Sequence, residues 1–392
     1  MRILSIMVCF VLPVSAHAQD DSPIRKVYES QEALSHLKIS SEGDFLAAEV
    51  GPVQERHMRV WSLSENKGES EIPVQVFLPG EKGAQGFSWS SHQFAWHDGQ
   101  VGVFSASTRG QARRLYVIQA KVSMASEFLT QEKIGGDLSL PVFSKDKSLL
   151  AFVKTQDGMQ DLYVYESKSD TVHRLTNDGQ PKDSMVFSPN GDHVIYTVEN
   201  EESGETDLWK AATKPVEAVL KPPVSDPKTQ KRKKKKRTAP KQEAPVAPRI
   251  QLFVPEALMR SPGNEFRPQF IGETLWMLVR DGESGGASLA TLSKDGNLNT
   301  VVQVAEPEAF DAVAISPSGE WWCVNPSTNG EIQCAPVDGG EGFTIATGLD
   351  DVKSPLFAKT PEGAPTELMF LGREKGGTTT GIYAYTLDAQ VH

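Results

Sequence analysis

One short motif has the residue types and spacing of a catalytic site. Gly282, Ser284 and Gly286 match the G-x-S-x-G pattern of a hydrolase nucleophile elbow. That elbow needs a strand, a sharp turn and a helix, with Asp and His following along the chain. Here the motif falls between two predicted strands, and the one histidine after it is the terminal His392. We therefore expect a flexible hairpin loop and predict no catalytic residue.

Metal and cofactor signals are similarly weak. The segment 295–299 has the Asp and Asn residues of a calcium loop but lacks its sixth-position Gly and distal Glu, so we expect a turn between strands. His173 and His193 fall within predicted strands, which favours structural roles. No histidine has helical i, i+4 spacing, and no Gly-rich phosphate loop or dinucleotide fingerprint occurs. We predict no metal and no cofactor.

Residues 1–18 have the features of a cleaved signal peptide. Arg2 precedes an apolar stretch at 3–14, and Ala16 and Ala18 form an A-x-A cleavage site. The stretch is too short for a transmembrane helix, and no later segment is long enough for one. We expect an exported mature chain, 19–392, in the periplasm or secreted, with no transmembrane anchor.

Two cysteines remain in the expected mature chain, Cys323 and Cys334. In an oxidising compartment such a pair favours a disulfide. If the intervening hairpin is centred between Thr328 and Asn329, the two cysteines face each other on adjacent strands. A centre one residue later pairs Cys323 with Pro336 instead and leaves the thiols diagonal. We favour the disulfide, with the shifted register as the alternative.

Charge divides the chain into an acidic body and a basic insert. The formal net charge is −11, yet 221–249 holds eleven Lys or Arg and two Asp or Glu, a local +9, so the remainder carries −20. The insert 221–248 is rich in Lys and Pro with almost no apolar residue, which predicts disorder. Its basic run is a candidate for binding an anionic surface, with a solvated loop as the alternative. The run consists of Lys231, Arg232, Lys233, Lys234, Lys235, Lys236 and Arg237. It lacks interleaved aromatic residues, so we expect no specific nucleic-acid binding.

Short β-rich runs, separated by Gly, Asp, Asn and Pro, repeat along the chain in the order a, b, c, d. The clearest unit has strands at 141–144, 149–153, 161–165 and 172–175, and the next has 186–188, 194–198, 207–209 and 217–220. Five further units have b strands at 45–48, 101–104, 275–278, 321–324 and 368–371. Their c strands are at 58–61, 115–118, 288–291, 332–335 and 382–385.

The spacing of these units predicts the fold. The a strands end at 40, 97, 144, 188, 271, 316 and 358, so the steps are 42 to 57 residues except for one of 83 that contains the insert. Four strands per period of about 40–50 residues are the signature of propeller blades. We predict an all-β protein: a β-propeller of four-stranded antiparallel blades, with seven blades favoured and six as the alternative.

The last unit lacks a d strand. The unassigned segment 24–28 could supply it and close the ring, which would remove exposed sheet edges. The alternative is that 20–35 is a loose tail.

Phe187 to Gly191, Asp207 to Trp209 and Arg174 to Thr176 resemble the repeats of TolB-type propellers. The same repeats occur in the N-terminal propellers of dipeptidyl peptidase IV and prolyl oligopeptidase relatives. The resemblance implies the fold rather than an activity. TolB also has an N-terminal α/β domain and the peptidases a hydrolase domain; neither is expected in this chain.

These features favour a non-enzymatic binding or scaffold protein of the cell envelope, which acts through propeller loops and channel on protein partners. Two alternatives remain: a propeller enzyme with its active site at the channel mouth, and an accessory propeller subunit of a separately encoded peptidase.

Overall fold

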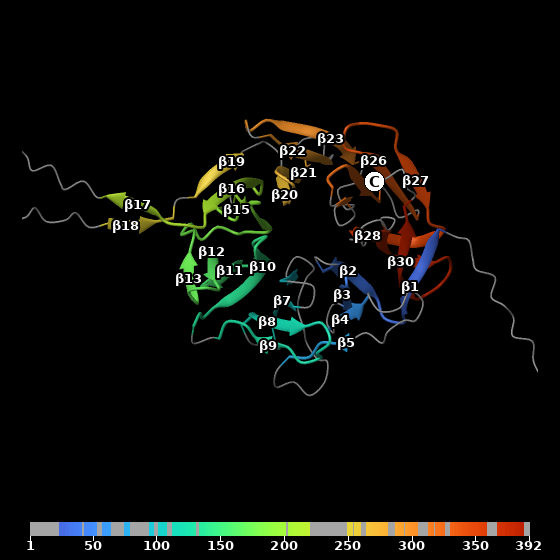
Figure 1. Cartoon of the computed structure of the whole chain (residues 1–392), viewed down its shortest axis with the longest axis horizontal. Helices are drawn as coiled ribbons and strands as arrows, with labels where there is room; N and C mark the ends of the chain where they lie inside the picture. The colour runs from blue at the N-terminus through green and yellow to red at the C-terminus, as the bar shows by residue number, and fades with distance from the viewer. Residues whose placement is uncertain are drawn as a thin grey trace, which may run out of the picture.

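Seven four-stranded antiparallel sheets stand around a central opening in the computed structural model of the chain (Figure 1). The structure describes residues 23–40, 43–52, 57–63, 74–78, 94–97, 101–107, 112–130, 133–200, 203–219, 249–253, 255–259, 264–280, 287–293, 295–304, 313–316, 318–325, 330–358 and 367–387. These ranges form strands and turns without a helix, and therefore include no helix able to cross a membrane. The predicted signal peptide 1–18 and the insert 221–248 lie outside them.

Each sheet is one propeller blade, with its strands in the order a to d from the opening outwards. Blade 1 contains β2 (Leu34–Ile39), β3 (Phe45–Val50), β4 (His57–Ser62) and β5 (Val74–Gln75). Blade 2 contains β6 (Phe94–Trp96), β7 (Val101–Ala106), β8 (Arg114–Gln119) and β9 (Ser126–Glu127). Blade 3 contains β10 (Asp137–Phe143), β11 (Leu149–Gln156), β12 (Met159–Glu166) and β13 (Thr171–Arg174). Blade 4 contains β14 (Met185–Phe187), β15 (His193–Glu199), β16 (Thr206–Ala212) and β19 (Glu256–Met259).

The remaining three blades complete the ring. Blade 5 contains β20 (Asn264–Ile271), β21 (Thr274–Arg280), β22 (Ala287–Leu292) and β23 (Leu298–Val304). Blade 6 contains β24 (Val313–Ile315), β25 (Trp321–Val324), β26 (Glu331–Pro336) and β27 (Phe343–Ala346). Blade 7 contains β28 (Leu349–Ala358), β29 (Glu367–Glu374), β30 (Thr380–Thr386) and β1 (Ile24–Ser30). The predicted seven-bladed propeller is confirmed.

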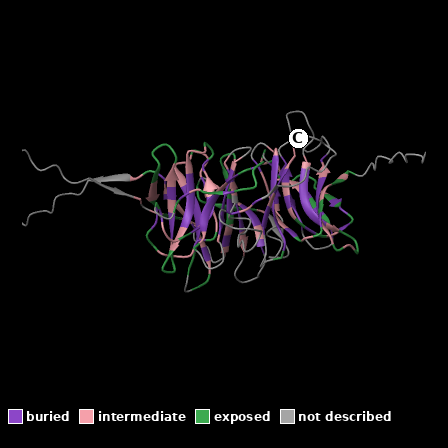
Figure 2. Cartoon of the chain, turned by 90° about the horizontal axis from the view of Figure 1, so that it is seen from below, coloured by how far each residue is buried: buried purple, intermediate pink, exposed green. Residues whose placement is uncertain are grey.

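The hydrophobic core lies between the blades. The described residues form seven apolar clusters, and each joins two successive blades, the seventh joining blade 7 to blade 1. Successive side chains of a strand point to opposite faces, so a b strand contributes to two clusters. In β3, Phe45 packs towards blade 2 and Leu46 towards blade 7. This explains why the central residues of the b strands are mostly apolar and buried. Figure 2 shows buried strand segments throughout the ring.

Ring closure uses the N-terminal strand, as predicted. Strand β1 pairs antiparallel with β30 and becomes the outermost strand of the last blade. Arg25 forms an ion pair with Glu367 at 3.0 Å, and Val27 and Tyr28 pack against the cluster between blades 7 and 1. The two ends of the ring are thus held together by a sheet.

The turns between the a and b strands share one hydrogen-bond pattern. The hydroxyl of Ser188 accepts a bond from the amide of His193 at 3.0 Å, and Ser316 accepts one from Trp321 at the same distance. Gly191, with φ 73°, returns a hydrogen bond to the Ser188 carbonyl. This left-handed conformation is why the turn favours glycine at that position.

The fourth strand of blade 4 differs from the prediction. Residues 217–220 were expected there, but β17 (Val216–Val219) pairs with β18 (Arg249–Leu252) in a separate ribbon that projects from the ring (Figure 1). The d position belongs to β19, which pairs with β16. Because β-forming segments flank the insert on both sides, the pattern alone cannot identify which one completes the blade.

Candidate functional site

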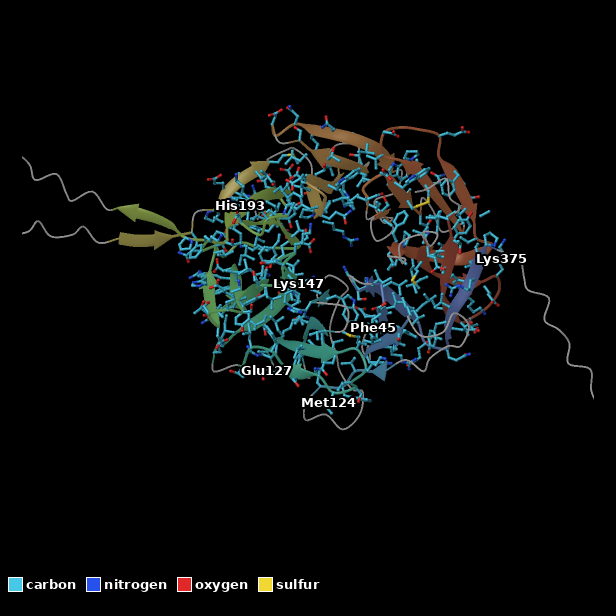
Figure 3. The ribbon with its side chains drawn as sticks, viewed as in Figure 1. Phe45, Met124, Glu127, Lys147, His193 and Lys375 are labelled. Atoms are coloured by element: carbon cyan, nitrogen blue, oxygen red, sulfur yellow. A yellow bond between two sulfur atoms is a disulfide. The ribbon has the colours of Figure 1, made fainter. Side chains whose placement is uncertain are left out.

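A cavity of about 630 Å³ lies at the centre of the ring. It is lined by residues of the innermost strand of every blade; the polar ones come from blades 1, 4, 5 and 7. One lining residue from each blade, in order, is Ile39, Ala95, Val142, Met185, Gln269, Ala314 and Leu356. Figure 3 shows side chains from all sides of the ring reaching towards this opening. The volume is within the range of binding pockets for small molecules or short segments of chain.

Four inner strands carry a β-bulge where they line the cavity. In β2, β10, β20 and β28 the pairing register shifts, so that two residues lie opposite one on the b strand. The first residue of each bulge is left-handed and is not glycine: His36 (φ 55°), Leu140 (φ 52°), Arg267 (φ 49°) and Ser354 (φ 51°). These residues belong to blades 1, 3, 5 and 7.

The bulges change what the strands present to the cavity. A bulge bends its strand and redirects a side chain, and bulges are frequent beside functional sites. Pro follows the left-handed residue in three of the four, at Pro141, Pro268 and Pro355. Pro has no amide N–H to donate to the ladder, which favours an interruption of pairing at these positions.

Charged residues line the cavity from different blades. Lys38 and His36 come from blade 1, Arg267 from blade 5, and Asp183 from the segment just before β14. The Nε2 atom of His36 lies 3.9 Å from Oε2 of Glu49, whose side chain is fully buried. The amide of Arg267 donates a hydrogen bond to Ser184 of blade 4 at 3.2 Å, which fixes this bulge to the neighbouring blade.

The a–b turn of blade 3 lies at one rim of the opening. Lys147 is labelled beside the opening in Figure 3, and its Nζ atom donates to the carbonyl of Trp96 in blade 2 at 3.4 Å. In the same turn, the hydroxyls of Ser144 and Ser148 donate to the Asp146 carboxylate. These bonds stabilise the charged form and lower the pKa of Asp146 to about 2.

The two cysteines predicted to form a disulfide are not among the residues that line this cavity. Cys323 and Cys334 are paired across β25 and β26 with Cα atoms 4.1 Å apart and form a disulfide. The register is the first of the two alternatives, and the bond is buried in the cluster between blades 6 and 7. The basic run at 231–237 and the G-x-S-x-G motif lie outside the described residues.

The other candidate motifs occupy ordinary structural positions. Within 295–299, the amide of Gly296 donates to the carbonyl of Ser293, so the segment begins as the expected turn between two strands. His173 lies in β13 beside the ring of Phe253, and His193 lies in β15. Across the ranges that the structure describes, no three His, Cys, Asp or Glu residues are grouped to hold a metal ion.

Sequence reasoning did not identify the residues that line the cavity. Three of these residues, Leu140, Arg267 and Ser354, share one sequence signal. Each is followed directly by Pro and lies three to four positions before the end of an a strand. That signal predicts a bulge in the strand. It does not predict which residues of different blades line the same cavity.

The fold and the cavity define the chain as a seven-bladed β-propeller with a central channel. No protein-family model and no curated protein sequence matches it. Among solved structures it is similar to the β-propeller domain of Cps50 (Swd1) from Myceliophteria thermophila, with 10% identity and a TM-score of 0.52 over 93% of this chain and 99% of that one.

Two further solved structures are similar at lower TM-scores. TolB from Acinetobacter baumannii has 14% identity and a TM-score of 0.49, over 79% of this chain and 64% of that one. A prolyl endopeptidase has 12% identity and a TM-score of 0.46, over 88% of this chain and 47% of that one. At these identities the similarities concern the fold alone.

Proposed function

We propose that this chain is an exported, non-enzymatic binding protein of the cell envelope, and that its channel holds part of a partner protein. The observation that carries the proposal is the cavity to which all seven inner strands contribute. A rigid ring of packed blades holds these residues in place, as binding residues require. The sequence features of 1–18 support export.

A comparison of retained partners tests the role of the channel. The bait is the full mature chain, exposed to envelope extract, beside two variants with one added Trp. Gln269→Trp fills the cavity, whereas Met159→Trp enlarges a side chain that is 57% exposed at a turn of blade 3. We expect the first variant to lose the partner and the second to keep it. Retention by both variants would rule out the channel as the binding site.

Export has a separate test. We expect N-terminal sequencing of the protein from the periplasm or medium to begin near Gln19. Recovery from the cytoplasm with Met1 intact would contradict it.

The basic run at 231–237 suggests a second contact, with an anionic surface such as lipid headgroups. Seven consecutive cationic residues would bind anionic vesicles with an affinity that falls steeply as salt rises. A chain with all seven changed to Gln is the matched control. Equal binding by both proteins would exclude this contact.

A further inference from the structure

Four left-handed residues of the inner strands line the cavity, whereas a fifth, Asp351 of β28, lies outside it. His36, Leu140, Arg267 and Ser354 occupy equivalent positions, about half-way along their strands, and all four line the cavity. A left-handed backbone is unfavourable for a residue with a Cβ atom and persists where the surrounding structure imposes it; such residues concentrate at functional sites. Four occurrences at equivalent strand positions beside the cavity therefore mark this part of the lining as a candidate contact point.

The charge of the cavity lining is opposite in sign to that of the body. Outside 221–249 the chain carries a net −20. Among the described lining residues, however, Arg267 and Lys38 are cationic, His36 becomes so when protonated, and Asp183 is the single acid. Cations inside a concave, partly dry site attract an anion more strongly than the same groups on an open surface.

We propose that Arg267, Lys38 and His36 form a belt that binds carboxylate groups, and that the ligand is an acidic segment of a partner protein. The inference rests on the proposed binding function and names the chemistry of its ligand. A guanidinium can hold a carboxylate through two parallel hydrogen bonds. Leu37, Val142 and Leu356 add apolar surface for the aliphatic parts of such a segment.

The strand edges around the cavity favour a peptide over a small anion as the ligand. Each inner strand is the end strand of its sheet, so one edge of its backbone is unpaired within the sheet. Seven such edges surround the cavity and offer amide and carbonyl groups to an extended segment.

Fluorescent tetraglutamate, with tetraglutamine as its neutral match, tests the belt. The full mature chain is used with 231–237 changed to Gln, because the basic run would itself bind an acidic peptide. We expect Arg267→Gln and Arg267→Gly to weaken tetraglutamate binding about tenfold or more, the effect of losing a charged hydrogen bond. Tetraglutamine should bind far more weakly.

Two controls separate binding from folding. Glycine adopts the conformation of residue 267 freely, so Arg267→Gly should melt no lower than its parent. Asp157→Gly likewise replaces a left-handed residue, with φ 53°, by glycine, but in a turn away from the cavity. It should leave binding of tetraglutamate unchanged. Citrate should displace the peptide only in large molar excess.

Three results would overturn the inference: unchanged affinity in Arg267→Gln, equal binding of tetraglutamine, or displacement by equimolar citrate, which would indicate a small-molecule ligand. The comparison of partners retained from envelope extract distinguishes failure of this inference from failure of the proposed function. If Gln269→Trp loses the partner while Arg267→Gln keeps it, the channel binds a partner by other chemistry.

Discussion

At the scale of the residue, buried polar groups connect blades 3 and 4. The side chain of Lys182 is fully buried, and its ammonium donates to the carbonyls of Gln160 and Gln180 at 2.9 Å and to Asp178 at 2.6 Å. An ammonium has three protons to donate, so its hydrogen bonding is complete. The same Nζ lies 5.9 Å from the ring centre of Tyr196. This cation therefore fixes the crossover between the two blades.

Tyr196 gives the first prediction. Its side chain is fully buried, and among the described residues no group hydrogen-bonds its hydroxyl. Because a buried hydroxyl without a partner is unfavourable, Tyr196→Phe should raise the free energy of unfolding by up to about 1 kcal/mol. Urea unfolding at pH 7 measures this, and a clear loss of stability would contradict it.

The same residue predicts a dependence on pH. Burial raises the pKa of Tyr196 well above its ordinary value, so the folded chain keeps the phenol neutral at pH values where the unfolded chain ionises. Its contribution to stability is therefore complete below about pH 10 and is lost as pH rises further. Tyr196→Phe should lose less stability than the parent between about pH 9 and pH 11, and an identical loss would contradict the assignment.

The disulfide gives a third prediction. Cys323 and Cys334 are 11 residues apart and both are buried. Changing both to Ala should lower the free energy of unfolding by about 2–3 kcal/mol, since the closed loop is short. Thiol labelling of protein from the periplasm, unfolded without reductant, should detect no free thiol. Two labelled thiols per chain would show that the bond is absent from the exported protein.

At the scale of the element, the ring depends on one strand. Strand β1 is separated in sequence from the rest of blade 7 by the whole ring, yet it pairs with β30 along its length. Without it, β30 would become an open edge and the cluster between blades 7 and 1 would lose Val27 and Tyr28.

Deletion of residues 19–30 should therefore lower the melting temperature of the whole ring in one cooperative transition. Deletion of 19–22 alone is the matched control, because it leaves β1 intact. Calorimetry of the two proteins measures the difference. Equal melting temperatures would show that β1 does not hold the ring closed.

At the scale of the whole molecule, the insert lies between the c and d strands of a single blade. Cleavage between β17 and β18 would separate the chain into two parts that still share blade 4, because β19 pairs with β16. Limited trypsin digestion should cut first at 228–241, and the two fragments should co-elute in gel filtration. Protection of this run, or separation of the fragments without denaturant, would contradict this organisation.

The sequence by itself determined the blade and its repetition. The Ser-Pro-x-Gly turns, the apolar b strands and the period near 45 residues depend on interactions within about 50 residues, and these can be read from the local pattern. For Cys323 and Cys334 the sequence favoured a disulfide but left two hairpin registers open, and the structure has the register that pairs them. The closing strand 24–28 was identified because the last blade lacked a partner.

The tertiary structure alone decided the site. His36, Lys38 and Arg267 come from blades far apart in sequence, and only closure of the ring brings them to one cavity. The left-handed bulges at His36, Leu140, Arg267 and Ser354 contradict the local preference of these residues, so the packing of neighbouring blades must impose them. The choice of β19 over β17 in blade 4 has a similar cause, because two segments with comparable local pattern compete and contacts with blade 5 through Leu258 and Met259 favour one of them.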